Sequence, residues 1–195
     1  DWTSHAWERA IGNIRYTDDD IPNGMTYAVL VRSTIAHGQI TSIDRDLARE
    51  VPGVLGVFTF DDLMTVARDG YHGTGYRDQP MIADGIVRHY GEPVAVVVAT
   101  EQRIAEHAAQ FVNVEYTPLP VVLDDREALA NRDALHRDVE PSADFVDLKG
   151  LSPLADNPNI YVRSILRTGD FDEVAKDAPH VFEHHFSTAS ASAPT

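Results

Sequence analysis

The side chains in this sequence that could take part in catalysis or metal binding are scattered. One group of them consists of three histidines. His180, His184 and His185 lie close together in the sequence and suggest a metal site, because neutral imidazole is a common metal ligand. The surrounding segment 181–187 has the composition of a β-strand, in which successive side chains point to opposite faces. His184 and His185 would therefore face apart, which indicates polar positions on a half-exposed strand rather than a metal site.

Two loop segments invite an ion-binding interpretation. The glycine-rich stretch Gly70–Gly75 is reminiscent of a phosphate loop, which follows a strand, opens a helix and offers a lysine or a helix N-terminus to the anion. Here the preceding residues have helical character, Asp78–Pro80 follows, and the stretch contains no lysine. The acidic triplet Asp18–Asp20 lacks the alternating oxygen ligands, the glycine and the closing glutamate of a calcium loop. It is interpreted as a solvated turn.

Two other candidates combine residues from different parts of the chain. Glu92 precedes Pro93 at the mouth of an apolar strand, but a general acid needs a partner, and nothing in the sequence places the nearest acidic residue, Asp84, on the same side. Ser33 and His37 could join an aspartate in a triad, yet the sequence has no Gly-x-Ser-x-Gly turn. Residue types and spacing therefore predict no catalytic, cofactor-binding or metal-binding residue in this chain.

Short strands separated by turns are the elements that would position these groups. Alternating apolar residues and β-branched side chains indicate the strands. Strands are predicted at 25–32, 39–44, 54–59, 86–90, 94–99, 112–116, 163–167 and 179–187. Pro22 and Gly24 predict a turn before the first of them, and Gly91–Pro93 a tight turn before the most apolar. The stretch 67–84 is predicted to be a long loop.

Helices are fewer and short. They are expected at 45–51, from Thr59, at 101–111, at 126–131 and within 169–176. Asp44 or Asp46 would accept hydrogen bonds from the first free N–H groups of one helix, and Thr100 would cap another. The helix at 101–111 has apolar residues at helical spacing, so one face is expected to pack on the sheet. These apolar positions are Ile104, Ala105, Ala108 and Phe111.

Composition excludes several classes of function. The formal net charge of −15, with 16 basic residues against 31 acidic ones, argues against nucleic acid and anionic membrane surfaces as partners. The sequence has no cysteine, which excludes disulfides, zinc–thiolate sites, cysteine-ligated clusters and a cysteine nucleophile. The longest apolar stretch, Pro93–Ala99, is too short to span a membrane. The first residues do not read as a secretory signal, and a cytoplasmic location is expected.

Ordered motifs in this chain resemble one protein family. The segments that carry the resemblance are Gly12–Asp19, Asn23–Ser33, Ala36–Asp44, Val51–Thr59, Asp78–Ala83, Val87–Ala99, Ala108–Asp124 and Glu127–Leu129. In order and spacing they resemble the a/b hammerhead domain that opens the molybdopterin-binding subunit of xanthine dehydrogenase, aldehyde oxidase and carbon monoxide dehydrogenase. Tyr90–Ala95 (Tyr-Gly-Glu-Pro-Val-Ala) is the most specific match. The resemblance covers roughly residues 8–130.

The resemblance implies an α+β fold: a hammerhead domain at 1–124, with a mixed sheet and two or more packed helices. Residues 125–195 would then form a connector and the first strands of the molybdopterin-binding domain. For the complete enzyme it implies hydroxylation of a carbon centre, or CO oxidation, with water as the oxygen source. The cofactors would be molybdopterin with molybdenum, together with 2Fe-2S clusters and FAD on other domains or subunits. The expected partners are the remainder of the subunit and the iron–sulfur and flavin subunits.

The sequence departs from the family pattern at a few positions. Asn23 stands where the family usually has proline, and Ser33–Ile35 replaces a usual Ser-Pro-His; both changes fall in turns or loops. Ala191 falls near the position where many members carry a glutamine beside the molybdenum, and a methyl group cannot donate a hydrogen bond. The family's pterin-binding loops and catalytic glutamate would lie beyond Thr195, so no catalytic residue is carried over.

Two hypotheses follow. In the first, the chain is the N-terminal scaffold part of a molybdenum hydroxylase, as a fragment or a split subunit, and is not catalytic by itself. In the second, it is a free-standing hammerhead module for binding or interaction, without redox activity. The ordered motifs favour the first hypothesis. The substrate, the electron acceptor and the oligomeric state depend on residues outside these 195 positions.

Overall fold

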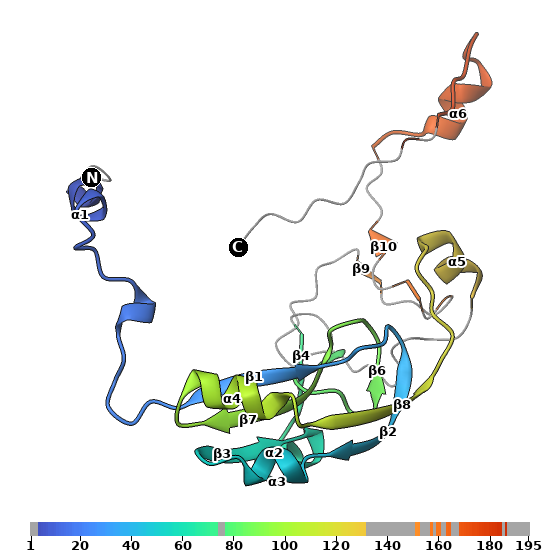
Figure 1. Ribbon diagram of the computed structural model, residues 1–195. Helices are drawn as coiled ribbons and strands as arrows, with labels where there is room; N and C mark the ends of the chain where they lie inside the picture. The colour runs from blue at the N-terminus through green and yellow to red at the C-terminus, as the bar shows by residue number, and fades with distance from the viewer. Residues whose placement is uncertain are drawn as a thin grey trace.

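Two small antiparallel sheets form the body of the protein (Figure 1). The structure is a computed structural model that describes residues 4–73, 77–131, 151–152, 157, 159–160, 163–164, 168–184 and 186. The strands are β1 (Tyr27–Arg32), β2 (Gly38–Asp44), β3 (Val54–Phe58), β4 (Tyr71–His72), β5 (Gln79–Pro80), β6 (Ile86–Val87), β7 (Pro93–Ala99), β8 (Asn113–Pro118), β9 (Leu151–Ser152) and β10 (Arg163–Ser164). The helices are α1 (Ser4–Ala10), the 3-10 helix η1 (Thr17–Asp19), α2 (Asp46–Glu50), α3 (Phe60–Val66), α4 (Gln102–Ala109), α5 (Asp125–Ala130) and α6 (Phe171–Lys176).

The apolar strand β7 is the central strand of its three-stranded sheet. One sheet has the order β1-β7-β3 and the other the order β6-β2-β8. Val96 of β7 pairs with Leu30 on one side and with Phe58 on the other. The α+β architecture is confirmed, and every ladder among the described residues is antiparallel, where a mixed sheet was expected.

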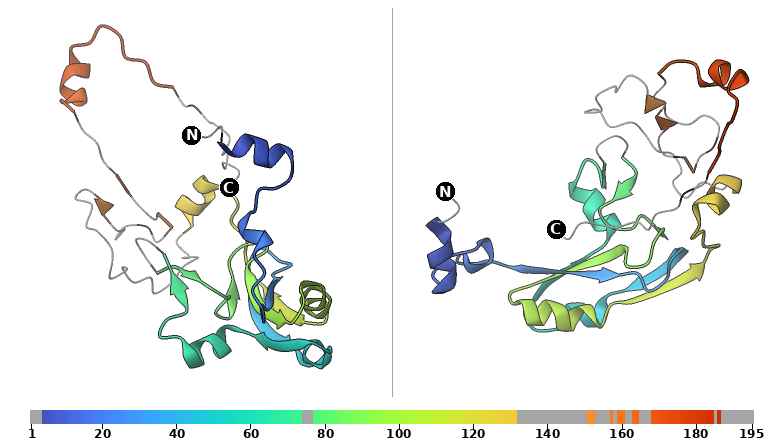
Figure 2. Two further views of the ribbon diagram at one scale, coloured as in Figure 1. Left: turned by 90° about the vertical axis from the view of Figure 1, so that its left-hand side faces the viewer. Right: turned by 90° about the horizontal axis from the view of Figure 1, so that it is seen from above.

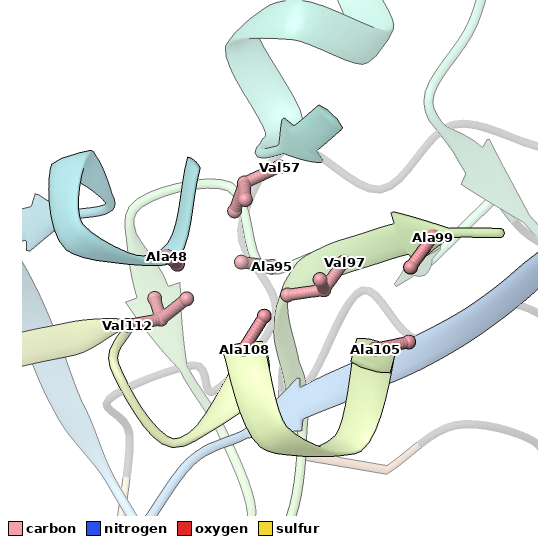
Figure 3. Packing of buried hydrophobic residues seen from close by; sticks show 8 residues of the cluster. All are labelled: Ala48, Val57, Ala95, Val97, Ala99, Ala105, Ala108 and Val112. Carbon is pink, nitrogen blue, oxygen red and sulfur yellow. The ribbon is translucent and has the colours of Figure 1, made fainter. Parts of the chain in front are cut away.

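The main core lies between β7 and the helices α2 and α4 (Figure 3). α4 packs against β1 and β7, and α2 packs against β3. Most of the core side chains are alanine or valine, and such small groups let a helix approach a sheet closely. The buried members are Ala48, Val57, Ala95, Val97, Ala99, Ala105, Ala108 and Val112. The predicted apolar face of α4 is thus confirmed at Ala105 and Ala108, while Phe111 remains 40% exposed.

A second, smaller cluster lies at the Pro93 end of β7. It contains the buried Ala83, Val87 and Val94, with Ile40 and Tyr116 among the half-buried side chains packed against it. These last residues belong to β2 and β8, so the cluster joins the two sheets. Because β7 contributes Val94 here and Ala95 to the main core, both faces of its first half are buried by the chain itself.

Several element boundaries differ from those predicted. The strand expected at 86–90 is only Ile86–Val87, because the following residues form the turn into β7. The loop 67–84 contains a short hairpin of β4 and β5. Thr100 does not cap α4: Glu101 is the N-cap residue and no side chain bonds there. Asp44 does accept the N–H of Asp46 at the start of α2, at 3.1 Å.

The first and last described helices lie away from the body. In all three views, α1 and α6 stand away from the sheets (Figures 1 and 2). The predicted turn and helix near Gly169 are confirmed by α6, whose N-cap Asp170 accepts the N–H of Glu173 at 3.1 Å. The strand predicted at 179–187 is wrong for its described residues, 179–184 and 186, which form no ladder. Residues 165–167 of the other predicted strand lie outside the described residues.

Candidate functional site: a buried ionic cluster beside β7

Four polar side chains meet at the entrance to β7, where Glu92 immediately precedes the strand. Tyr71 comes from β4, Asp84 and Arg88 flank β6, and Glu92 occupies the turn. The charged side chains are largely buried, with 15% of Asp84, 11% of Arg88 and 4% of Glu92 exposed. Charged residues are rarely buried to this extent unless they are paired. This ionic cluster is therefore the strongest candidate site in the part of the chain that the structure describes.

Arg88 holds the ionic cluster together. Its Nη1 lies 2.8 Å from Asp84 Oδ1 and its Nη2 lies 3.3 Å from Asp84 Oδ2, a two-pronged arrangement that suits a guanidinium and a carboxylate. Arg88 Nη1 also lies 3.9 Å from Glu92 Oε1, and the Arg88 backbone N–H donates to Glu92 Oε2. The Tyr71 hydroxyl donates to Asp84 Oδ2. The structure thus corrects the expectation for Glu92: Asp84 does lie on its side, bridged to it by the arginine.

The electrostatics of the ionic cluster favour fixed charges. Burial raises the pKa of Tyr71 to about 12, and the hydrogen bond to Asp84 adds to this effect, so the phenol stays protonated at neutral pH. Burial opposes ionisation of Asp84, but hydrogen bonds from Arg88 and Tyr71 outweigh it and lower the pKa of Asp84. For Arg88, burial is likewise outweighed, by the hydrogen bond and charge of Asp84 and by the charge of Glu92, and its pKa is raised.

These shifts decide what the ionic cluster can do. A general acid or base works best with a pKa near the working pH. The shifts at Asp84 and Tyr71 move both pKa values away from neutrality, and the Asp84 carboxylate is occupied by Arg88. The arrangement therefore suits a structural lock rather than proton transfer. It joins the hairpin of β4, the β6 segment and the turn at Glu92 into one unit.

Backbone hydrogen bonds fix the same turn to its neighbours. The Ser33 N–H donates to the Glu92 carbonyl at 2.8 Å, and the Gly91 N–H donates to the Ser33 carbonyl at 3.0 Å. Gly91 has a φ of 81°, a conformation that favours glycine. The Ala83 N–H donates to the Pro93 carbonyl at 2.7 Å. The predicted tight turn at Gly91–Pro93 is confirmed, and it is held by β1 on one side and by the β6 segment on the other.

The structure does not assemble the hypothetical serine triad. The Ser33 hydroxyl donates to the Ile35 carbonyl at 2.5 Å, and Ser33 is almost fully buried. His37 Nδ1 lies 2.6 Å from the Pro120 carbonyl. Each side chain is thus engaged with a different backbone carbonyl, which positions the chain rather than activating a nucleophile.

The ion-binding candidates also have structural roles. In the acidic triplet, Asp19 Oδ2 accepts the Tyr16 N–H at 2.8 Å, and Asp20 pairs with Arg15 at 3.1 Å. In the glycine-rich stretch, Tyr71–His72 pairs with β5 instead of opening a helix, and 74–76 lies outside the described residues.

Two of the three histidines of the predicted group, His180 and His184, lie among the described residues. His180 and His184 each lie beside a phenylalanine ring, with centroids 6.3 Å and 6.1 Å apart, and His185 lies outside the described residues. Within the described ranges, no three side chains of histidine, aspartate or glutamate are grouped so that they could hold a metal ion. No helix in the same ranges is long and apolar enough to cross a membrane.

A second ion pair, between Arg45 and Asp62, lies beside β3, an edge strand of the β1-β7-β3 sheet. Arg45 pairs with Asp62 and donates to the Val57 carbonyl at 3.0 Å. Asp62 Oδ2 also accepts the Thr59 N–H at 2.8 Å, which caps the start of α3. The hydrogen bond from Arg45, with those from Thr59, lowers the pKa of Asp62 to about 2. A hollow of about 370 Å³ adjoins the pair, lined by residues 54–58, Arg49 and Asp62.

Sequence reasoning missed the ionic cluster for a physical reason. Asp84, Arg88 and Glu92 follow one another at four-residue intervals, a spacing that brings side chains together on a helix. The segment is a short strand followed by a turn, so a helical rule did not apply to it. Tyr71 reaches the cluster only through the β4–β5 hairpin, which local sequence does not show. One sequence feature could have indicated the cluster: two acidic residues, Asp84 and Glu92, lie on either side of Arg88 in the sequence, next to a very apolar strand.

Comparison with known proteins places this geometry in context. A sequence profile described as "Aldehyde oxidase and xanthine dehydrogenase, a/b hammerhead domain" matches residues 11–120. The xanthine dehydrogenase molybdenum-binding subunit of Escherichia coli O157:H7 is 34% identical over 187 residues, which is 92% of this chain and 22% of that protein. The carbon monoxide dehydrogenase large chain of Hydrogenophaga pseudoflava is 34% identical over 169 residues, 86% of this chain and 20% of that protein.

A solved structure agrees with the sequence matches. Quinoline 2-oxidoreductase from Pseudomonas putida 86 superimposes with a TM-score of 0.60 at 36% identity, over 66% of this chain and 17% of that one. In each of these comparisons the chain spans about a fifth of the relative's length or less. The match therefore concerns one region of a larger subunit.

Proposed function

The chain belongs to the aldehyde oxidase and xanthine dehydrogenase a/b hammerhead family, and we propose that it serves as the N-terminal scaffold part of the molybdenum-binding subunit of a molybdenum hydroxylase. One observation carries the proposal: nearly the whole chain aligns with about a fifth of such a subunit. The second support is the ionic cluster, whose shifted pKa values suit structure rather than catalysis.

The proposal assigns no catalytic, cofactor-binding or metal-binding residue to this chain. Among the described residues, no three histidine, aspartate or glutamate side chains are grouped so that they could ligate a metal ion directly. In the complete enzyme the molybdopterin would be held by the remainder of the subunit. The 2Fe-2S clusters and FAD would be carried by iron–sulfur and flavin subunits or domains, and we place the enzyme in the cytoplasm. Carbon hydroxylation or CO oxidation is the proposed reaction class.

The proposal also divides the chain near Asp124. Residues 1–124 would form the hammerhead domain, and 125–195 the connector and the first strands of the molybdopterin-binding domain. Asp124 caps α5 by accepting the Arg126 N–H at 2.9 Å, so a new element begins at that point. The side chain of Asn157 donates to the Leu129 carbonyl at 2.8 Å, and that of Asn159 donates to the Ala128 carbonyl at 3.0 Å. These bonds tie the later segment to α5, which supports grouping the two.

The activity of the native complex tests this function. The complex that contains the natural chain would be purified and offered xanthine, quinoline, an aldehyde or CO, with a dye as electron acceptor, in ¹⁸O-labelled water. We expect turnover of at least one substrate with ¹⁸O in the product, molybdenum by elemental analysis, and iron–sulfur and flavin spectra. A complex without molybdenum and without turnover would instead support a free-standing interaction module.

A further inference from the structure

One face of the β1-β7-β3 sheet is apolar and open. Strand residues two apart share a face, so Val94, Val96 and Val98 point away from the main core, which takes the alternate residues of β7. Val94 is fully buried by the segment 83–87, whereas Val96 and Val98 are only half-buried. The residues that the structure describes therefore cover this face at one end of β7 and leave the other end uncovered.

The flanking strands extend the uncovered area. By register, Leu30 and Phe58 lie on either side of Val96, and they are 41% and 45% exposed. The Phe58 ring rests over Gly56, since a Cβ built on that glycine would lie 2.5 Å from the ring. We call this surface the open face. Its members are Ala28, Leu30, Gly56, Phe58, Val96 and Val98.

The open face carries no charged side chain, although the chain has 31 acidic and 16 basic residues. Arg32, which ends β1 after a register shift, donates to the Gly91 carbonyl at 2.9 Å. Depletion of charge and large apolar side chains mark the centres of permanent interfaces. A sheet face exposed to solvent would instead carry mainly polar residues.

Building on the proposed function, we propose that the open face is a permanent interface covered by an apolar segment of the same molybdenum-binding subunit, from the part that follows these 195 residues. Two observations select this occupant. The relatives are several times longer than this chain, so most of each relative lies outside the matched region. The open face continues along the same side of β7 from Val94, which the smaller cluster already buries.

Photo-crosslinking in the native complex tests the occupant. Phe58 is replaced by p-benzoylphenylalanine in the complete subunit, the complex is irradiated, and the crosslinked peptides are identified by mass spectrometry. We expect crosslinks to peptides of the same subunit beyond residue 195. Crosslinks to a second copy, distinguished by mixing isotope-labelled and unlabelled subunits, would overturn the proposal. Crosslinks to another subunit, or the absence of any crosslinked peptide, would overturn it as well.

A matched position provides the control. Leu47 on α2 is 61% exposed but has charged neighbours, Asp46, Arg49 and Glu50. The same photo-reactive residue at position 47 should give little or no crosslink within the subunit. If both positions crosslink the same peptides equally, the open face has no special role and the proposal fails.

Charge insertion gives an independent readout that separates this proposal from the proposed function. We expect Leu30→Asp to lower the yield of assembled complex about tenfold, because an unpaired carboxylate would be buried at the interface, whereas Leu47→Asp should leave it unchanged. Molybdenum in the wild-type complex tests the proposed function alone. A molybdenum-containing complex that tolerates Leu30→Asp would refute the open face and leave that function intact.

Discussion

The two faces of the β1-β7-β3 sheet are built from different side chains. The face toward α2 and α4 carries alanine and valine and is closed by these helices along β7, with Val97 at 0% exposure. The other face carries Leu30 and Phe58, both large and both substantially exposed. Small residues allow close helix packing within the chain, whereas a contiguous group of exposed large apolar residues is typical of an interaction surface. The difference indicates that the first face stabilises the domain itself and the second joins it to a larger protein.

A charge placed on each face gives the largest expected contrast. Val97→Asp would bury a carboxylate without a partner and should destabilise the chain by about 4 kcal/mol or more, enough to unfold a domain of ordinary stability. In the isolated 195-residue chain, where the open face has no partner segment, Leu30→Asp should cost less than about 1 kcal/mol, because its carboxylate stays hydrated. Circular dichroism during urea unfolding measures both. Equal losses would remove the distinction between the two faces.

The ionic cluster should be nearly as sensitive as the closed face. Arg88→Met removes the positive charge between Asp84 and Glu92 and should cost about 3–5 kcal/mol, as when one partner of a buried ion pair is lost. Urea unfolding gives the value. Adding Asp84→Asn and Glu92→Gln to Arg88→Met should recover part of the loss, because no unpaired charge then remains. If the single change has no effect, the cluster does not lock the turn.

A smaller effect is expected where the closed face meets the end of α2. Gly53 has a φ of 93°, and a Cβ there would lie 2.8 Å from Ile104 Cδ1 of α4. Gly53→Ala should therefore cost about 1–3 kcal/mol from strain and crowding. Gly85, with a φ of 99° and nothing within 4 Å of an added Cβ, isolates the backbone part. Gly85→Ala should cost only about 1 kcal/mol in the same thermal unfolding measurement; equal losses would show that crowding against α4 is unimportant.

The smallest effect concerns acid stability at the sheet edge. The pKa of Asp62 falls from 3.8 to about 2 in the folded chain, mainly through the hydrogen bond from Arg45. Its contribution to stability is complete above pH 3.8 and is lost as pH falls through about 2. Because the pair is partly exposed, the contribution is ~1 kcal/mol. Thermal midpoints of the wild type and Asp62→Asn should converge between pH 4 and pH 2; a constant difference would contradict the assignment.

The sequence predicted the elements around β7 well because their signals are local. The apolar run Pro93–Ala99, the turn at Gly91 and the alanine face of α4 each follow from a few neighbouring residues, and all three occur in the structure. The order of strands in each sheet was not predictable, because pairing joins segments such as β1 and β7 that are far apart in the chain. The strand expected at 179–187 failed because composition favours a strand only when a partner strand is available.

The ionic cluster and the open face were beyond local sequence reasoning for the same reason. Asp84 and Glu92 were both considered, but only the fold of the β6 segment places Arg88 between them. Leu30 and Phe58 become neighbours of Val96 only through strand pairing. The family could be identified from the sequence, because the order and spacing of motifs can be compared directly even where contacts between distant residues cannot be derived.

The central claim is that this chain is one part of a molybdenum-binding subunit, and the most direct test is the mass and molybdenum content of the natural gene product in its native complex. We predict a chain several times longer than 195 residues, in keeping with relatives of which it covers about a fifth, and molybdenum bound in that complex. A native complex containing this chain but no molybdenum would contradict the account.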